Sequence, residues 1–355
     1  MTKTEKKIDF EKAKRTATNL LEIHEVYEFP INLFSVFDEY DNLTVVTYKE
    51  IMDNCGLTRQ QVIDNCKSAE GALSYNVKLD EYILAYNEQI TNTRPREMIY
   101  WTLCHEFGHY ILQHNKEKGV EMISRRVLEP TDRDPYETEA NFFARFFLTP
   151  PSIIAATNMN DANKISSYFG VSYTSANITR KYIADSMKKG IIFNIPDILK
   201  SCYTKFIQRI NFGKTCIKCN SYFEIKNIKN CSICNGTVFN KYKKGDNPMT
   251  KYIGIEVDHT GRAKICPCCQ NEDLDYDGNF CNVCSAYLVN ECADLYDDDP
   301  FRNQEILVES CGTKLSGNAR YCHKCGNPSR FMNAGHLRAW NYTPIERDEL
   351  EDLPF

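Results

Sequence analysis

Residues 102–114 read TLCHEFGHYILQH and place His105 and His109 four positions apart, with Glu106 directly after the first histidine. Side chains four apart on a helix share one face, so both rings can bind one zinc ion while the glutamate stays near the open coordination position. The competing interpretation is an ordinary helix that carries two histidines by chance. Because the chain has only seven histidines and this spacing suits metal chemistry, we favour the zinc site.

Apolar residues around this motif recur at steps of three and four, which predicts a helix from about Arg96 to His114 with one buried face. The two histidines of the motif project from an adjacent face. Cys104 is expected to be a thiol of the core. The residues expected on the buried face are Tyr100, Leu103, Phe107, Tyr110 and Ile111.

The segments before this helix predict a small sheet and several helices. Residues 10–28 have the pattern of an amphipathic helix, and residues 30–65 that of a short helix, a strand around LTVVTY and another helix. The stretch ALSYNVKLDEYILAYNEQI alternates apolar and polar residues, which predicts two strands that turn at Leu79 and Asp80.

Helical patterns also follow the motif. In DPYETEANFFARFFLTPP, Asp134 can cap a helix, Pro135 fits its first turn, and the prolines at 150 and 151 end it. ISSYFGVSYTSANITRKYI predicts two short helices joined at Gly170.

A catalytic zinc needs a third protein ligand, and the helix that starts at Pro135 offers one. Glu137 and Asn141 lie one turn apart on one face, beside the small Ala140 and Ala144, which would allow a close approach. We expect Glu137 to bind zinc and Asn141 to orient a histidine ligand. Glu139 points the other way, so we expect a solvated charge there and keep it as the fallback ligand.

HEFGH, with YILAYNEQI before it and ETEANFFARFFLTP and FGVSYTSANITRKYI after it, resembles the ImmA/IrrE family of zinc metallopeptidases over roughly residues 10–190. The resemblance implies a zincin-like fold with zinc held by His105, His109 and Glu137. It implies Glu106 as the catalytic base, and all four positions match the family pattern. The implied substrate is a helix-turn-helix repressor, whose cleavage releases genes of a mobile element or a stress response.

These residues imply hydrolysis without a covalent intermediate. Glu106 would take a proton from the attacking water and return it to the leaving amine, while zinc takes up the growing negative charge. A further group that stabilises the oxyanion is expected, and His114, Tyr110 and Tyr136 remain alternatives for it.

Composition changes near residue 200, where cysteine, asparagine, glycine and lysine replace the helix-period apolar residues. In a reducing compartment, seventeen cysteines indicate metal binding rather than disulfides. Two pairs of CxxC motifs, each with eleven residues between its halves, predict two closed structural zinc ribbons. The predicted ligands are Cys216, Cys219, Cys231 and Cys234 in the first ribbon and Cys266, Cys269, Cys281 and Cys284 in the second.

A third copy, VESCGTKLSGNARYCHKCG, has Val308 where the first cysteine of a pair would stand. We therefore expect a degenerate or weak site, and three tightly held zinc ions in the chain, one catalytic and two structural, with a fourth only if this ribbon binds metal. Its remaining ligands are Cys311, Cys322 and Cys325. The candidates for its fourth ligand are Cys292, His323 and Glu309.

The fold class predicted from these patterns is α+β. The predicted parts are a zincin-like, mostly helical metallopeptidase domain with a small sheet at 1–200, four-cysteine zinc ribbons at 210–245 and 260–295, a degenerate ribbon at 305–335 and a tail at 336–355.

Charge alternates along the ribbons. Residues 214–244 hold seven lysines and one acid, residues 266–299 nine acids and no base, and residues 311–338 five bases and no acid. A nucleic-acid track would be interrupted at the middle ribbon, so we expect the ribbons to dock the substrate or regulate the peptidase. Contact of the outer ribbons with DNA or RNA is the second choice.

The overall composition is that of a soluble globular protein, with 42% hydrophobic residues, 26% charged residues and a formal net charge of -5. The first residues, MTKTEKKIDFEKAKR, lack the apolar core of a secretory signal. No run approaches the roughly 20 apolar residues that span a bilayer. We expect a cytoplasmic protein without membrane contact.

Two other functions compete with the peptidase. A DNA-binding transcriptional regulator would use the helix-turn-helix-like stretch after residue 165 and the ribbons, but that stretch offers only Arg180 and Lys181, near its end. A scaffold with an inactive zinc site is the other alternative. The intact Glu106 argues against it.

Overall fold

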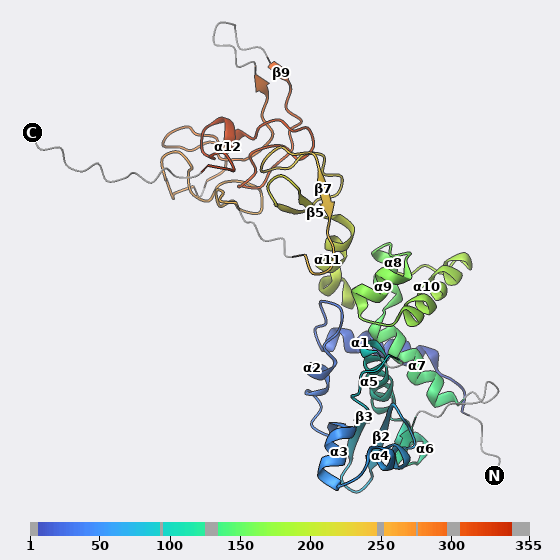
Figure 1. Ribbon diagram of the computed structural model, residues 1–355. Coiled ribbons are helices and arrows are strands. Elements are labelled where there is room, and N and C mark those ends of the chain that lie inside the picture. The colour runs from blue at the N-terminus through green and yellow to red at the C-terminus, as the bar shows by residue number, and fades with distance from the viewer. Residues whose placement is uncertain are drawn as a thin grey trace, which may run out of the picture. The chain divides into compact units, whose positions relative to one another are not determined.

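The computed structural model describes residues 6–92, 95–124, 134–246, 252–274, 276–296 and 306–342. Contacts divide the chain into two compact units, Met1–Ile207 and Gln208–Phe355. The division falls inside helix α11, Asp197–Phe212 (Figure 1). Among the described residues, no helix is both long and apolar enough to cross a membrane.

A four-stranded sheet lies in the first unit, with the order β1-β3-β2-β4. Strands β2 and β3 form the antiparallel hairpin that the sequence predicted, and β1 runs parallel to β3. Asp80, in the turn, has a left-handed φ of 55°. The strands are β1 Leu43–Thr47, β2 Gly71–Asn76, β3 Glu81–Tyr86 and β4 Met122–Ser124.

Ten helices precede α11 in the described part of the first unit, which together with the sheet confirms the α+β class. The single helix expected near residue 60 is two helices, because Gly56 ends the first of them in a left-handed conformation. The helices are α1 Phe10–Ile23, α2 Leu33–Phe37, α3 Tyr48–Cys55, α4 Arg59–Cys66, α5 Arg96–Ile111, α6 His114–Lys118, α7 Pro135–Leu148, α8 Pro151–Ala156, α9 Ala162–Phe169 and α10 Tyr173–Lys188.

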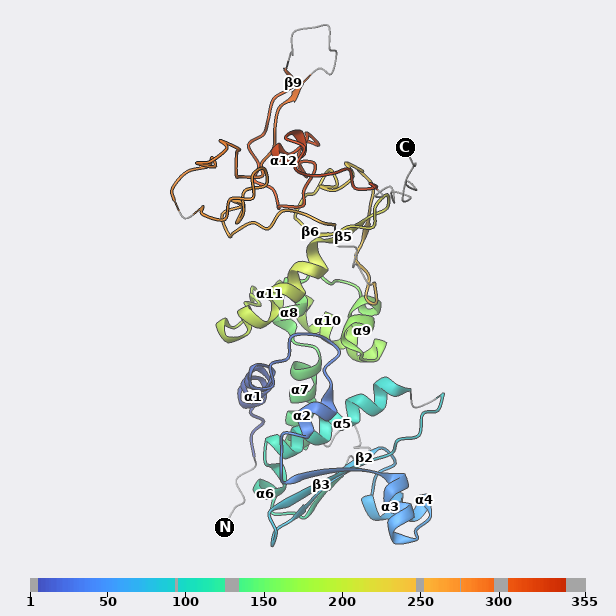
Figure 2. The same cartoon turned by 90° about the vertical axis from the view of Figure 1, so that its left-hand side faces the viewer.

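Helix α5 packs against strands β2 and β3 and also against α7 (Figures 1 and 2). Every residue from Thr102 to Tyr110 is buried, so the helix has no solvated face along the HEFGH motif. Only one buried face was predicted from the sequence. The difference arises because α7 covers the side of the helix that the sheet leaves open.

Gly108 lets α5 and α7 come close. A Cβ at this position would lie 2.9 Å from the Phe143 ring and 3.3 Å from the carbonyl oxygen of Ala140, closer than ordinary side-chain contacts. The glycine of HEFGH thus meets the small alanine of α7. This approach brings the acidic first turn of α7 to the two histidines.

The second unit contains short strands and loops around cysteine-rich cores. Strands β5 Gly213–Cys216, β6 Tyr222–Glu224 and β7 Phe239–Lys241 form one sheet, in the order β6-β5-β7. Strands β8 Leu295–Tyr296 and β9 Ile306–Val308 pair with each other, and α12 spans Arg330–Asn333. The start of the expected tail belongs to this unit, because Leu337 is buried against Phe331. Residues 343–355 lie outside the described part.

Candidate metal centres

His105 and His109 on α5 meet Glu137 on α7. The Nε2 atoms of the histidines are 3.2 Å apart, and the two carboxylate oxygens of Glu137 lie 3.2 and 3.3 Å from them. Two ligands about 2.0–2.1 Å from a tetrahedral zinc are about 3.3–3.4 Å apart. Each of these contacts has about the spacing of two corners of a zinc tetrahedron, with a different oxygen of Glu137 facing each histidine.

Burial and charge set the protonation of these groups. Burial lowers the pKa of His109 to about 4, although the Glu137 carboxylate opposes this shift. Burial alone would raise the pKa of Glu137, but hydrogen bonds and charge from both histidines outweigh it and hold that pKa well below its usual range. A neutral imidazole and an ionised carboxylate are the forms that bind a metal ion.

Glu106 is fully buried one position after the first histidine. A Cβ on Gly71, at the start of β2, would lie 3.6 Å from the Glu106 Cγ and 2.7 Å from the Thr102 methyl group. The side chain is therefore confined between its own helix and the sheet. It lies outside the ligand cluster of His105, His109 and Glu137.

Helix α5 ends earlier than the sequence predicted, and this places His114 behind the metal site. Gln113 adopts a left-handed φ of 60°, and His114 begins the separate helix α6. Its Nδ1 lies 2.9 Å from the Nδ1 of His109, and its Nε2 lies 3.1 Å from the Glu139 carboxylate. Both ring nitrogens are thus engaged, which removes His114 from the candidate oxyanion donors.

Glu139 is buried, with a 1% exposed side chain, although its position in the sequence predicted a solvated charge. The Nζ of Lys6 lies 2.9 Å from its carboxylate, and the backbone N–H of Asp9 donates to it at 2.7 Å. The N-terminal segment therefore covers this residue. The partner of the Nδ1 of His109 is His114, so this ring is not the histidine that Asn141 orients.

Two tyrosines were the other candidates for the oxyanion donor. The Tyr110 hydroxyl donates to the Asn42 side chain at 2.7 Å, which occupies its proton. The Tyr136 ring lies edge-on to the His114 ring, with the Nζ of Lys6 3.8 Å from its centre. Tyr136 thus lies against the residues behind the metal site, and its role as the oxyanion donor stays a prediction.

Residues 67–179 match the Peptidase_M78 family model, described as the IrrE N-terminal-like domain. This segment is therefore similar to an IrrE N-terminal-like domain. The matched range contains α5 and α7 and therefore every residue of the His–Glu cluster. A comparison with curated proteins found no match. The family match supports a zinc metallopeptidase of the IrrE and ImmA type.

The helix-turn-helix-like stretch corresponds to α9 and α10, and the family match ends inside α10, at residue 179. The two helices pack against each other, and Gly170 between them has a φ of 67°. Thr179 on α10 is buried and shares a hydrogen bond with Thr149. This part of α10 therefore packs within the first unit.

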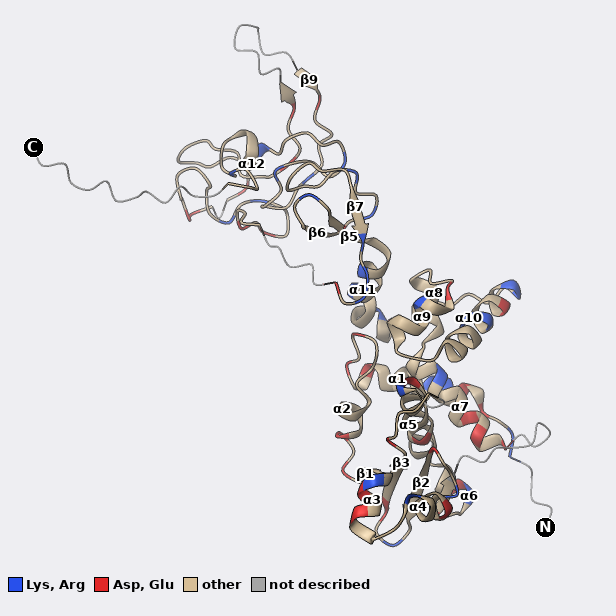
Figure 3. Cartoon of the chain, in the orientation of Figure 1, with Lys and Arg blue, Asp and Glu red and all other residues tan. Residues whose placement is uncertain are grey.

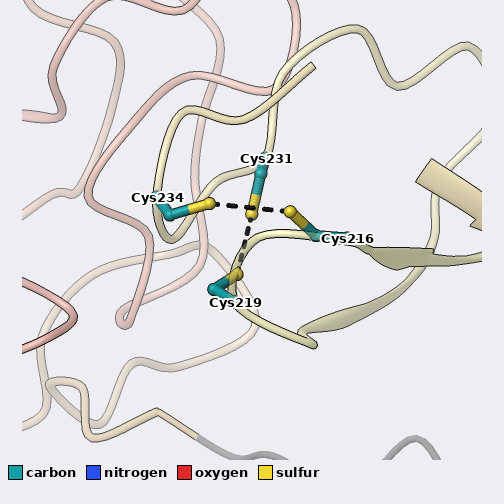
Figure 4. Close-up of side chains that lie close together, drawn as sticks. All are labelled: Cys216, Cys219, Cys231 and Cys234. Carbon is teal, nitrogen blue, oxygen red and sulfur yellow. Dashed lines mark hydrogen bonds between the residues drawn. The ribbon is translucent and has the colours of Figure 1, made fainter. Parts of the chain in front are cut away.

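Outside the residues that the family model matches, the cysteines of the first predicted ribbon form a tight sulfur cluster (Figure 4). Cys216 lies 3.5 Å from Cys234 and Cys219 lies 3.4 Å from Cys231, sulfur to sulfur. A disulfide would need about 2.05 Å. Sulfurs about 2.3 Å from a tetrahedral zinc are about 3.8 Å apart, so the spacing is that of a four-cysteine zinc site.

The second predicted ribbon has the same arrangement. Sulfur distances are 3.6 Å between Cys266 and Cys284 and 3.7 Å between Cys269 and Cys281. Cys268 is exposed beside these ligands and lies outside the cluster. The second tetrad therefore also fits a zinc site.

The third ribbon differs from the expectation of a degenerate site, because Cys292 supplies a fourth sulfur. Cys292 lies 3.4 Å from Cys325, and Cys311 lies 3.5 Å from Cys322. Eighteen residues separate the first two ligands instead of two, and the β8–β9 hairpin lies between them. The first half of this ribbon thus lacks the CxxC spacing, and the fourth sulfur comes from Cys292, one of the three candidates named from the sequence.

We call the three clusters ribbon 1 (residues 216–234), ribbon 2 (residues 266–284) and ribbon 3 (residues 292–325). Ribbons 1 and 3 contact each other around their second CxxC motifs. The backbone N–H groups of Lys229 and Asn230 donate to the carbonyl of His323, at 3.0 and 3.1 Å. In return, the N–H groups of Arg320 and Tyr321 donate to the carbonyl of Ser232, at 2.7 and 3.0 Å. Ribbons 1 and 3 are therefore parts of one body.

Proposed function

We propose that this protein is a zinc endopeptidase that cleaves a helix-turn-helix repressor and so releases genes of a mobile element or a stress response. The observation that carries the proposal is the zinc-like spacing of His105, His109 and Glu137, with Glu106 adjacent on the same helix. The family match supports the peptidase class. The repressor as substrate follows from the resemblance to the ImmA/IrrE family.

The chemistry divides between the metal and Glu106. A zinc ion at this centre would polarise the scissile carbonyl and make a water acidic. The Glu106 carboxylate accepts the proton of the attacking water and later gives it to the leaving amine. His105, His109 and Glu137 would hold this ion, and three protein ligands are the number that catalytic zinc sites have.

We expect the zinc-loaded protein to cut the repressor encoded beside its gene once, and Glu137→Ala to lose both this activity and one zinc ion. The carboxylate bridges both histidines, so its loss removes a ligand and leaves two. Intact mass of the repressor measures cleavage, and native mass spectrometry counts zinc. Glu11→Ala, which removes an 85% exposed carboxylate, is the control. Unchanged cleavage by Glu137→Ala would refute the proposed ligand set.

A second candidate function is binding of nucleic acid by the ribbons. Ribbons 1 and 3 dock directly, so the acidic ribbon 2 does not separate the two basic ones as the sequence order suggested. Lys229 and Lys324 are exposed on either side of this seam. Blue segments mark lysines and arginines on several loops of the second unit (Figure 3). Aromatic rings accompany the charges, because Lys218 lies over Trp340 and Arg338 over Tyr342. Bases stack on such rings, which favours single strands.

Reversing charge at the seam tests this candidate. Lys229→Glu with Lys324→Glu is expected to weaken binding of a labelled single-stranded oligonucleotide about tenfold or more and to flatten its salt dependence. Lys264→Glu is the control, because this exposed lysine already pairs with Glu256. Fluorescence anisotropy at several salt concentrations measures both effects. Equal binding by the seam and control variants would exclude the seam as the binding surface.

A further inference from the structure

The contact between His109 and His114 fixes the positions of two protons. The Nε2 of His109 faces His105 and Glu137, so the Nδ1 of His109 carries the proton when the ring binds a metal. That proton can only be donated to the Nδ1 of His114, 2.9 Å away. His114 then keeps its own proton on Nε2 and donates it to Glu139, at 3.1 Å. A single arrangement of protons therefore satisfies both hydrogen bonds, from His109 to His114 and from His114 to Glu139.

Glu139 ends this chain as a buried acceptor. Its side chain is 1% exposed, and a buried carboxylate is costly unless charges and hydrogen bonds compensate it. Lys6 supplies the charge at 2.9 Å, and the N–H of Asp9 supplies a hydrogen bond at 2.7 Å. Lys6 also pairs with Glu117 on α6, the helix that begins with His114. The N-terminal segment thus closes over the rear of the metal centre.

The two histidine ligands differ in this support. His109 has an outer partner, whereas the Nδ1 of His105 has no hydrogen-bond partner among the residues that the structure describes. The break after α5 produces the difference. On a continuous helix, residues five apart point about 140° from each other, so His114 could not face His109 without the reversal at Gln113.

We propose that His114 and Glu139 are positioning residues of the proposed zinc centre, and that Lys6 makes its metal affinity depend on the docked N-terminal segment. The inference rests on the proposed function only in taking the His–Glu cluster as the metal site. His114 orients the ring of His109 and increases its basicity, as outer partners of metal-binding histidines do. Without these hydrogen bonds, the ring of His109 can rotate or present the wrong nitrogen to the metal ion.

The test measures the zinc affinity of this centre in the full-length protein. Zinc is withdrawn with increasing chelator and counted by native mass spectrometry, and Glu137→Ala identifies the ion that belongs to the centre. His114→Leu is expected to weaken zinc affinity about 10- to 100-fold. His114→Gln is expected to restore most of it, since an amide can accept from His109 and donate to Glu139.

Lys6→Ala tests the contribution of the N-terminal segment in the same experiment. Lys6→Ala is expected to weaken zinc affinity measurably, whereas Lys7→Ala, at the exposed next position, leaves it unchanged. Nitrogen NMR of the histidine rings should show a protected Nδ1 proton on His109 that His114→Leu loses. A role in packing alone would let leucine substitute and would leave Lys6→Ala without effect.

The outcomes separate this inference from the proposed function. Unmutated zinc affinity in His114→Leu would overturn the inference and leave the peptidase proposal standing. Zinc bound in the unmutated protein, weakened by His114→Leu and accompanied by no cleavage of the repressor, would support the inference and count against the proposed substrate. Absence of zinc from this centre in the unmutated protein would overturn both.

Discussion

Glu106→Gln is expected to abolish repressor cleavage while all bound zinc stays in place. Glutamine keeps the size of the side chain between α5 and the sheet, where a bulkier group would meet Gly71. It cannot accept the proton of the attacking water. General acid–base catalysis contributes about 10²- to 10⁴-fold, so the rate should fall by at least this factor.

Single-turnover cleavage, followed by intact mass of the repressor, measures the loss, and native mass spectrometry measures zinc. Glu97→Gln is the matched control, because this glutamate stands in the first turn of the same helix, away from the histidines. We expect it to cleave at the unmutated rate. A Glu106→Gln protein that cleaves normally would show that another group is the base; one that loses zinc would make Glu106 part of the ligand set.

The helical part of the site was readable from the sequence because helix geometry is periodic. His105 and His109 lie four apart in α5, and Glu137 follows the cap at Asp134 by three positions in α7. Glycine and alanine mark where the two helices meet. These local rules were sufficient to bring three ligands together from two separate stretches of chain.

The contacts that support the metal site from behind could not be predicted from helix periodicity. On a helical wheel of α7, Glu139 lies on the face that is predicted to be solvated. Its burial depends on Lys6 and Asp9, more than 120 residues earlier in the chain. The apolar pattern of α5 gave no sign of the reversal at Gln113, a non-glycine residue in a left-handed conformation. Tertiary contacts and an unfavoured backbone conformation decide both features.

Ribbon 3 shows the limit of reading by fixed spacing. A search for CxxC pairs finds Cys322 and Cys325 but misses Cys292, because the first pair is opened by the β8–β9 hairpin. Alignment of the three ribbons by spacing alone placed Val308 at the position of the missing cysteine. The three-dimensional contact, with Cys292 and Cys325 3.4 Å apart, identifies the fourth sulfur directly.

Cys292→Ser is expected to lower the zinc content of the protein from four ions to three, one ion for each remaining cluster of potential ligands. Structural zinc in small modules contributes on the order of 10 kcal/mol to folding, so ribbon 3 should unfold when its site is broken. Its buried core consists of two cysteine ligands with Leu315 and Ala319, which is too little apolar surface to fold without metal.

The unfolding should spread to ribbon 1, because the hydrogen bonds that Ser232 and His323 accept across the contact need both ribbons to be folded there. Limited proteolysis and thermal melting of the zinc-loaded protein measure this spread. Cys268→Ser is the matched control, since this thiol lies beside a ligand but outside every cluster, and we expect four ions and an unchanged melt. Four ions in Cys292→Ser would mean that the other three cysteines of ribbon 3 hold zinc with another ligand. Loss of ribbon 3 with an undisturbed ribbon 1 would mean that the docking contacts contribute little to the stability of the unit.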